Sequence, residues 1–432
     1  MARLLLRGAR VVDPAHQRDE RADVLVEDSL IAEVGPGVDG SGAHVIDCDG
    51  LVVAPGLVDL HTHLREPGRE EAETVETGAR AAALGGFTAV CAMPNTDPVA
   101  DHLAIVLEVA ARGEKAGVCE VVPSGAITKG LRGESLVEMG ELSEAGVRLF
   151  TDDHNCVQSA RVMRLALEYA RTFEGVISQH AQDESLSEEW QMHEGHYSAL
   201  LGLRGAPSEA ESVVVARDLA LSRLTGGRLH VTHVSAAQTV DLLRDARARG
   251  IQVTADVTPH HLTLADEDLQ SYDTNLKVNP PLRSAEDRDA LRRGLAEGVL
   301  DAVATDHAPH AEEDKEVEFD QARPGTTGLE TAVAVVLTEL VEPGVIDMAT
   351  AVERLSTRPA RILGLADQGG PIEPGRSANL VAFDPSAGWT VGERPFASRG
   401  RNSAFLGRRL RGRVIHTVFR GDPVVRDGEA TR

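Results

Sequence analysis

The sequence predicts an α/β protein: a (β/α)8 TIM-like barrel with a small β-sandwich domain formed by both termini. In the middle of the chain, eight strand-like apolar runs alternate with helix-like segments over about 300 residues, which favours parallel strands. Both ends instead hold short apolar runs bounded by Gly, Pro and Asp, which are typical of a β domain. We therefore assign residues 1–55 and 368–432 to the β domain and residues 56–367 to the barrel.

The predicted strands of the barrel are short and rich in aliphatic residues. They are Gly56–His63, Phe87–Asn95, Cys119–Thr128, Val147–Asp153, Val176–His180, Leu229–Ser235, Ile251–Pro259 and Leu300–His307. The intervening segments are rich in Ala, Leu, Glu and Arg, with apolar residues at helical spacing. These helical segments are Glu71–Leu84, Leu103–Ala116, Val162–Arg171, Glu209–Leu224 and Ala237–Arg249. At the ends of the chain we expect strands over Leu4–Gly8, Asp23–Glu27, His44–Asp47, Ala378–Asp384 and Arg413–Phe419.

The composition excludes several classes of function. The 68 Asp and Glu outnumber the 44 Lys and Arg, and the net charge of −24 disfavours binding to nucleic acid. No apolar stretch reaches the ~20 residues of a membrane span, and the first apolar block is too short for a signal peptide. The four cysteines lie far apart and are expected to be buried thiols. The sequence also holds neither a dinucleotide-binding motif nor a P-loop. These features predict a cytoplasmic protein.

Potential metal ligands lie at the ends of five predicted strands. The active site of such a barrel forms at the C-terminal ends of its strands, so these positions should meet at one rim. His61 and His63 share one face of the first strand because side chains alternate along a strand. The other candidates are Asp152, Asp153, His180, His233, Asp306 and His307. Imidazoles and carboxylates together suit a borderline cation such as Zn²⁺, singly or as a pair.

Not all of these candidates are expected to bind metal. Asp152 could instead cap the segment that follows it. We expect no direct metal contact from His154 or His307, although both lie next to a candidate ligand.

Several motifs resemble those of the amidohydrolase superfamily and, within it, the bacterial type I dihydroorotases. The matching segments are Val58–Gly68 (VDLHTHLREPG), Ala92–Thr96 (AMPNT), Phe150–Asp153 (FTDD), Lys277–Arg283 (KVNPPLR), Ala304–His310 (ATDHAPH) and Pro324–Glu330 (PGTTGLE). Together they are spread over residues 58–330 of the chain. The chain departs from the resemblance at His154, where glycine is expected.

The resemblance implies a metal centre with two Zn²⁺ per subunit, bridged by hydroxide and by Asp153. It assigns His61, His63 and Asp306 to one ion, and His180 and His233 to the other. Asp306 is also implied to be catalytic, because it can carry a proton from the hydroxide to the leaving nitrogen. The residues implied to bind substrate are His63, Arg65, Asn95, Asn279, His310, Pro324 and Gly325.

The implied reaction is the reversible conversion of L-dihydroorotate into N-carbamoyl-L-aspartate, a step of de novo pyrimidine (UMP) biosynthesis. Arg65 favours a substrate that carries a carboxylate, because a guanidinium binds a carboxylate through two parallel hydrogen bonds. A surface ion pair with Glu66 or Glu70 is the alternative role for this arginine. The resemblance also implies a homo-oligomer, and a complex with aspartate transcarbamoylase stays open.

Two other functions compete with this one. The first is a dihydropyrimidinase- or hydantoinase-like cyclic amidase. Many relatives of that kind carry a carboxylated lysine on the fourth strand, but Val147–Asp153 holds no lysine, which argues against this alternative.

The second alternative is a silent scaffold subunit for aspartate transcarbamoylase. The complete set of metal ligands argues against it. The acidic stretch Ala311–Arg323 is either a solvated loop or a lid over the site.

Overall fold

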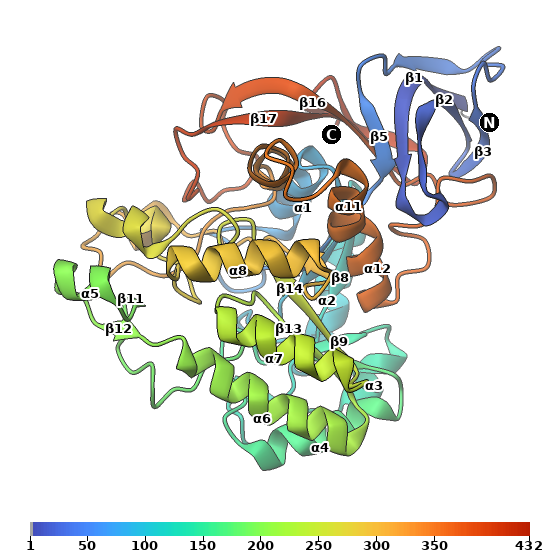
Figure 1. Cartoon of the computed structure of the whole chain (residues 1–432). Helices are drawn as coiled ribbons and strands as arrows, with labels where there is room; N and C mark the ends of the chain where they lie inside the picture. Colours follow the sequence, from blue (N-terminus) through green and yellow to red (C-terminus); the bar gives the residue numbers. More distant parts are fainter. Residues whose placement is uncertain (1–2) are drawn as a thin grey trace.

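The computed structural model describes residues 3–432, so Met1 and Ala2 of the predicted β domain lie outside the described residues. Its centre consists of two parallel sheets (Figure 1). The first contains β6 (Leu57–Thr62), β7 (Phe87–Ala92) and β8 (Glu120–Pro123). The second contains β9 (Leu149–Thr151), β10 (Val176–Gln179), β13 (Arg228–Val231), β14 (Val253–Val257) and β15 (Ala302–Val303). Each of these strands overlaps one of the eight predicted from the sequence.

Isolated bridges join the two parallel sheets at both edges. Gly125 pairs with Phe150 between β8 and β9. Thr62, at the end of β6, pairs with His307, which follows β15. The parallel strand order therefore runs from β6 to β15 and returns to β6, so that the loops after all eight strands lie at the same end.

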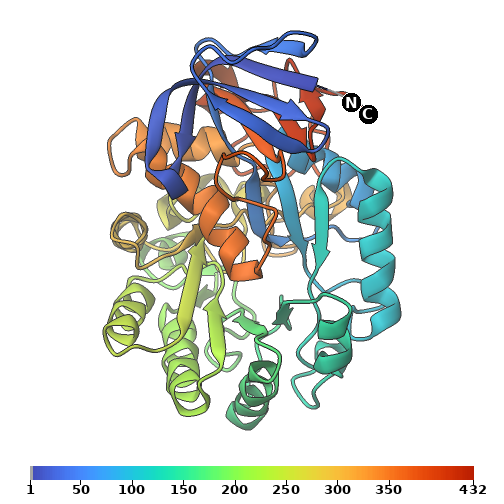
Figure 2. The ribbon, with the colours of Figure 1, turned by 90° about the vertical axis from the view of Figure 1, so that its right-hand side faces the viewer.

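Helices follow these strands and lie outside them (Figures 1 and 2). The longer ones are α1 (Val75–Leu84), α2 (Leu103–Ala116), α4 (Ala160–Arg171), α6 (Glu209–Thr225), α7 (Ala237–Ala248) and α8 (Ala285–Ala296). In α4, Met163, Ala166, Leu167 and Ala170 are buried, a helical spacing that presents one apolar face to the strands. Thr74 caps α1 by accepting a hydrogen bond from the backbone N–H of Thr77 at 3.1 Å. All five predicted helices overlap observed ones.

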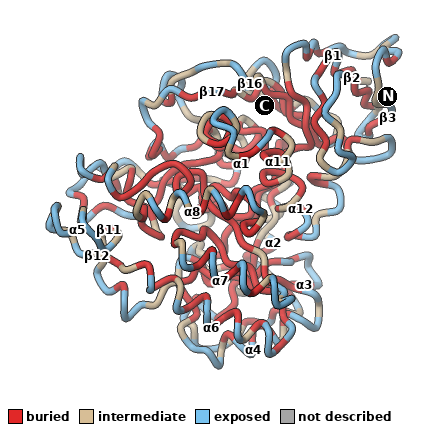
Figure 3. The backbone as a smooth tube through the Cα atoms, viewed as in Figure 1, coloured by how far each residue is buried: buried red, intermediate tan, exposed pale blue. Residues whose placement is uncertain are grey.

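Shorter elements complete this region. They are α3 (Met139–Glu144), α5 (His196–Leu201), α9 (Glu312–Lys315), α10 (Ala332–Val336), α11 (Met348–Val352), α12 (Arg358–Leu363), β11 (Met192–His193) and β12 (Gly205–Ala206). Buried residues run continuously through the centre of the molecule, whereas α5 and the β11–β12 pair project from it (Figure 3). Within residues 3–432, no helix is both long and apolar enough to cross a bilayer.

Both ends of the chain contribute to one nine-stranded sheet, which lies beside the parallel strands (Figure 2). Its strands are β1 (Arg3–Asp13), β2 (Arg18–Glu27), β3 (Leu30–Gly35), β4 (His44–Asp47), β5 (Val52–Pro55), β16 (Leu380–Thr390), β17 (Arg409–Phe419), β18 (Asp422–Arg426) and β19 (Glu429–Ala430). The two halves meet where β5 pairs antiparallel with β16.

Alternating residues of β1 bury different faces of the terminal sheet. Leu4 and Leu6 belong to one apolar cluster, whereas Leu5 packs with Leu25 and Val38 in another. Alternation along a strand explains how one short segment supports two apolar layers. All four cysteines are buried and free, as predicted.

Candidate active site

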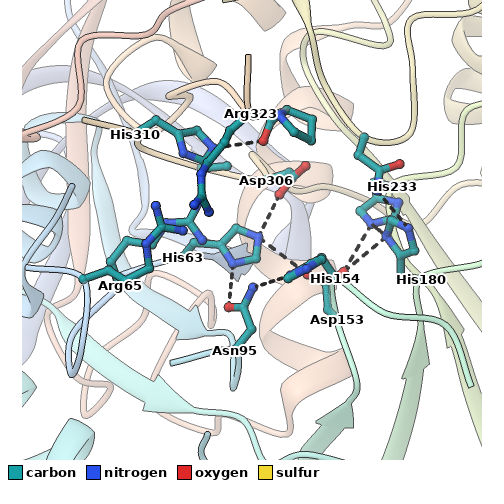
Figure 4. A pocket seen from close by; sticks show the side chains of 15 residues that line it. His63, Arg65, Asn95, Asp153, His154, His180, His233, Asp306, His310 and Arg323 are labelled. Atoms are coloured by element: carbon teal, nitrogen blue, oxygen red, sulfur yellow. Dashed lines mark hydrogen bonds and ion pairs between the residues drawn. The ribbon is translucent and has the colours of Figure 1, made fainter. Parts of the chain in front are cut away.

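His61, near the end of β6, and His63, directly after that strand, face a common pair of carboxylates, Asp153 and Asp306. Figure 4 shows His63 with these two aspartates. The Nε2 atom of His61 lies 3.2 Å from Asp153 Oδ2 and 3.6 Å from Asp306 Oδ1. The Nε2 atom of His63 lies 3.5 Å and 3.3 Å from the same two oxygens. All four side chains are buried, so this first cluster is a compact, water-poor group of atoms that can bind a metal ion.

The second oxygen of Asp153 faces another pair of imidazoles. Asp153 Oδ1 lies 3.4 Å from His180 Nδ1 and 3.5 Å from His233 Nε2. These two nitrogens are 2.9 Å apart. Asp153 therefore stands between two histidine pairs and directs one oxygen to each.

The outer nitrogens of the first two histidines are held by neighbouring side chains. His61 Nδ1 is hydrogen-bonded to Thr232 Oγ1, and His63 Nδ1 to Asn95 Oδ1, both at 2.9 Å. Such contacts fix the ring orientation and the tautomer of a metal-binding histidine. The Nε2 atoms are thereby left to face the carboxylates. Asp256 helps to fix the loop after β13 by accepting a hydrogen bond from the backbone N–H of His233 at 2.7 Å.

Three residues of the site have a positive φ angle, a backbone conformation that residues other than glycine rarely adopt. The φ angles of Arg65, His233 and Asp306 are 62°, 37° and 48°. Positive φ costs a residue other than glycine roughly 1 kcal/mol or more and persists where surrounding contacts impose it. The loops after three different strands are therefore held in shape at the site.

The buried carboxylates and imidazoles shift one another's pKa values. Burial alone would lower the pKa of His61, but the carboxylates of Asp153 and Asp306 raise it to about 10. Burial alone would raise the pKa of Asp153, but His61, His180 and His233 hold it well below its usual range. The pKa of Asp306 is lowered in the same way, against burial, by His61 and His63. The ionised carboxylates therefore make the space between these side chains favourable for a positive charge.

The donor set fits a borderline metal ion. Two groups have all their ligand atoms within 4.8 Å of one another: His61, Asp153 and His233, and His61, His63 and Asp306. Two ligand atoms on one tetrahedral Zn²⁺ lie roughly 3.3 Å apart, which is close to the separations described above. Among residues 3–432, the buried Nδ1 of His233 lacks a hydrogen-bond partner. Four imidazoles and two carboxylates are ligands of the kind that zinc prefers.

A cavity of about 140 Å³ opens above these ligands. All the predicted site residues except His61 line this cavity. The eleven that do so are His63, Arg65, Asn95, Asp153, His180, His233, Asn279, Asp306, His310, Pro324 and Gly325. The structure thus brings together residues from loops after seven strands. His307, by contrast, uses both ring nitrogens elsewhere, since Nε2 lies 3.2 Å from Glu73 Oε2 and Nδ1 accepts the N–H of Gly328.

Arg65 is a buried cation at the wall of this cavity. Its Nε donates to the backbone oxygen of Pro309 at 3.1 Å, and burial lowers its pKa to about 10. The alternative of an ion pair with Glu66 or Glu70 is wrong, because Glu66 pairs with Arg112 and Glu70 accepts the backbone N–H of Gly68. Arg65 thus stays charged at neutral pH and available to an anion.

The structure adds His154, Arg69 and Arg323 to the cavity wall, and sequence reasoning missed all three. Asp314 of α9 lies between the two arginines, 3.0 Å from Arg69 Nη2 and 3.0 Å from Arg323 Nε. Each missed residue is next to or within a segment already noted: His154 follows Asp153, Arg69 follows the first motif, and Arg323 precedes Pro324. Adjacency to these segments was the available signal.

Known proteins resemble the chain over its full length. A sequence model described as Dihydro-orotase-like matches residues 50–239. The chain is 50% identical over 425 residues to the dihydroorotase of Pelotomaculum thermopropionicum, covering 98% of this chain and 99% of that protein. It is 49% identical over 433 residues to the dihydroorotase of Streptomyces coelicolor, covering 100% of both. The chain belongs to the dihydroorotase family.

Solved structures relate this family member to other cyclic amidases. L-Hydantoinase from Arthrobacter aurescens superposes with a TM-score of 0.89 at 27% identity, covering 100% of this chain and 98% of that one. Dihydropyrimidinase from Brevibacillus agri shares the fold, with a TM-score of 0.84 at 24% identity, covering 99% of this chain and 96% of that one. The mixed α/β architecture of the chain is thus that of these amidohydrolases.

Proposed function

We propose that this chain is a zinc-dependent dihydroorotase that interconverts L-dihydroorotate and N-carbamoyl-L-aspartate in de novo pyrimidine biosynthesis. The full-length relatives named dihydroorotase support this assignment. The structural observation that carries it is the position of Asp153, whose two oxygens each face a pair of imidazoles. A carboxylate so placed is suited to be shared between two cations.

The ligands of the proposed metal centre follow from the two clusters. His61, His63 and Asp306 would hold one Zn²⁺, His180 and His233 the other, and Asp153 both. When bound, the ions would supply a hydroxide at neutral pH and polarise the ring carbonyl.

Asp306 is the proposed acid and base of the reaction. Its lowered pKa keeps it ionised at neutral pH, so it can accept a proton from the attacking oxygen nucleophile. In hydrolysis, the new C–O bond forms at the ring carbonyl carbon and the C–N bond of the ring breaks. The leaving nitrogen needs a proton, which Asp306 returns to it. Cyclisation of N-carbamoyl-L-aspartate uses the same groups in reverse.

The cavity wall is the proposed substrate site. Arg65, Asn95 and His310 would bind the ring carboxylate, while Asn279 and the backbone of Pro324 and Gly325 would contact the ring amides. Among residues 3–432, Asn279 Oδ1 is buried without a hydrogen-bond partner. A buried unpaired polar atom costs about 1–3 kcal/mol, so a ring N–H that donates to this oxygen gains binding energy.

A hydantoinase- or dihydropyrimidinase-like activity is the second candidate, because the solved structures just described belong to that class. Their substrates lack the ring carboxylate that Arg65 would bind. The test is to assay purified protein with dihydroorotate, N-carbamoyl-aspartate, hydantoin and dihydrouracil, with zinc counted on the same sample. Equal turnover of dihydrouracil and dihydroorotate would overturn the assignment. A zinc-free, inactive protein would instead favour the silent scaffold.

The proposal extends to architecture and assembly. We interpret the returning order of parallel strands as a (β/α)8 barrel spanning residues 56–367, with the terminal sheet as a separate β-sandwich domain. A cytoplasmic homo-oligomer, and a complex with aspartate transcarbamoylase, stay predictions of the family resemblance.

A further inference from the structure

His154 lies at the wall of the cavity, next to the proposed metal centre but outside both ligand groups of the described chain. It follows Asp153 in the loop after β9, and its side chain is exposed rather than packed into the core. Figure 4 shows it beside Asn95, across the cavity from His310. A side chain so placed can meet a molecule that enters the cavity.

Two hydrogen bonds connect His154 to His63 through Asn95. His63 Nε2 faces Asp153 and Asp306, so its Nδ1 carries the proton that is donated to Asn95 Oδ1 at 2.9 Å. Since the side-chain oxygen of Asn95 accepts this proton, its amide nitrogen Nδ2 is the atom that points to His154. Nδ2 lies 3.1 Å from Nδ1 of His154. Nδ1 of His154 is therefore the acceptor.

The tautomer of His154 follows from this contact. A neutral imidazole that accepts at Nδ1 carries its proton at Nε2 and donates from there. Among residues 3–432, Nε2 of His154 has no hydrogen-bond partner. The ring thus offers one free N–H donor, and the position of the ring is fixed by Asn95.

Two arginines share the cavity wall with His154. Arg65 and Arg69 both line the cavity, and their charges act on His154 together with the stronger, opposite charge of Asp153. Asn95, which orients the ring, is itself a proposed carboxylate-binding residue. An anion held by Arg65 and Asn95 would therefore lie close to this imidazole.

We propose that Nε2–H of His154 donates a hydrogen bond to the ring carboxylate of the substrate, so that His154 helps to determine substrate specificity. This inference rests on the proposed function. The ring carboxylate keeps its charge throughout the reaction, so a contact with it stabilises ground state and transition state alike. Loss of the contact should therefore raise KM and leave kcat nearly unchanged.

The experiment compares substitutions of His154 in the full-length, zinc-loaded enzyme. His154→Ala removes the donor, His154→Phe keeps a ring without it, and His154→Gln keeps an amide N–H. We expect Ala and Phe to raise KM for dihydroorotate about 10- to 100-fold, with kcat within about twofold, because a hydrogen bond to a charged group is lost. His154→Gln should recover part of the loss. His102→Ala, at an exposed histidine before α2 whose side chain makes no capping bond, is the matched control.

Metal content and inhibition distinguish specificity from a structural role. Zinc per subunit should be unchanged in all variants. Inhibition by orotate, which carries the ring carboxylate, should weaken in His154→Ala, whereas inhibition by uracil should not.

Several results would overturn the inference. An unchanged KM in His154→Ala, full activity in His154→Phe, or a fall in kcat that follows loss of zinc would each exclude a donor role. If the unmodified, zinc-loaded enzyme fails to turn over dihydroorotate, it is the proposed function that fails.

Discussion

The carboxylates of Asp152 and Asp153 make separate contacts although the two residues are adjacent at the end of β9. Asp152 Oδ1 accepts the backbone N–H groups of Ile127 and Thr128, each at 2.8 Å. Asp153 faces four imidazoles instead. Successive side chains along an extended chain point in opposite directions, which directs one carboxylate to the loop after β8 and the other to the four imidazoles of the proposed metal centre.

The two aspartates should therefore respond differently to substitution. Asp152→Ala leaves two buried N–H groups unpaired and should lower the free energy of unfolding by about 2–4 kcal/mol, with zinc retained. Asp153→Ala should lose at least one zinc per subunit. Urea unfolding and metal counting on the same samples measure both effects. Equal zinc loss in the two variants would contradict this division.

Asp306→Ala should abolish turnover while most of the zinc stays bound. The other proposed ligands of its ion, His61, His63 and Asp153, remain in place, whereas the proposed proton carrier is lost. General acid–base catalysis contributes about 10²- to 10⁴-fold, so kcat should fall by at least that factor. Steady-state kinetics with zinc counting provide the measurement. Residual activity above a tenth of the unmodified value would exclude the proposed role.

Arg65→Ala should weaken the binding of substrates that carry a carboxylate. A lost charge-assisted pair is worth about 1.5–3 kcal/mol, which corresponds to a rise in KM for dihydroorotate of about 10- to 100-fold. Arg112→Ala, which removes a partly exposed arginine paired with Glu66 and Glu108, is the control and should leave KM unchanged.

Chelation should remove activity and lower thermal stability together. A ligand that binds only the folded state stabilises it, so the metal-free protein should unfold at a lower temperature. Adding Zn²⁺ back should restore both properties. A midpoint of thermal unfolding that is independent of zinc would contradict a metal centre built from buried ligands.

Glu330 should make stability depend on pH outside the active site. Burial raises its pKa from 4.5 to about 7, although it accepts the backbone N–H groups of Ala397 and Ser398. Between these values the folded state binds more protons than the unfolded state, so stability falls as pH rises from 4.5 to 7. Glu330→Gln removes this titration. It should be more stable than the unmodified protein by about 1–3 kcal/mol at pH 8, with a difference that vanishes near pH 4.5. Urea unfolding at both pH values measures the difference.

The sequence predicted the strands and longer helices because their apolar periods are local. It also placed His61 and His63 together, since a spacing of two residues in a strand determines which face they share. Periodicity alone could not choose between Asp152 and Asp153, because that choice depends on which side of β9 faces the centre. His154 and Arg323 were missed because their positions depend on the paths of loops, which no local pattern specifies. The order of strands in the terminal sheet was unpredictable for a similar reason, since β5 and β16 pair across most of the chain.

The pairing of β5 with β16 has a consequence for biosynthesis. As the ribosome elongates the chain from the N-terminus, β1 to β5 emerge early and β5 keeps an unpaired edge. An open strand edge invites association with other chains, and its natural partner is not translated until the catalytic segment is complete. A chain truncated before residue 380 should therefore aggregate. In the full-length chain, β16 covers the free edge of β5, and it becomes available only near the end of translation.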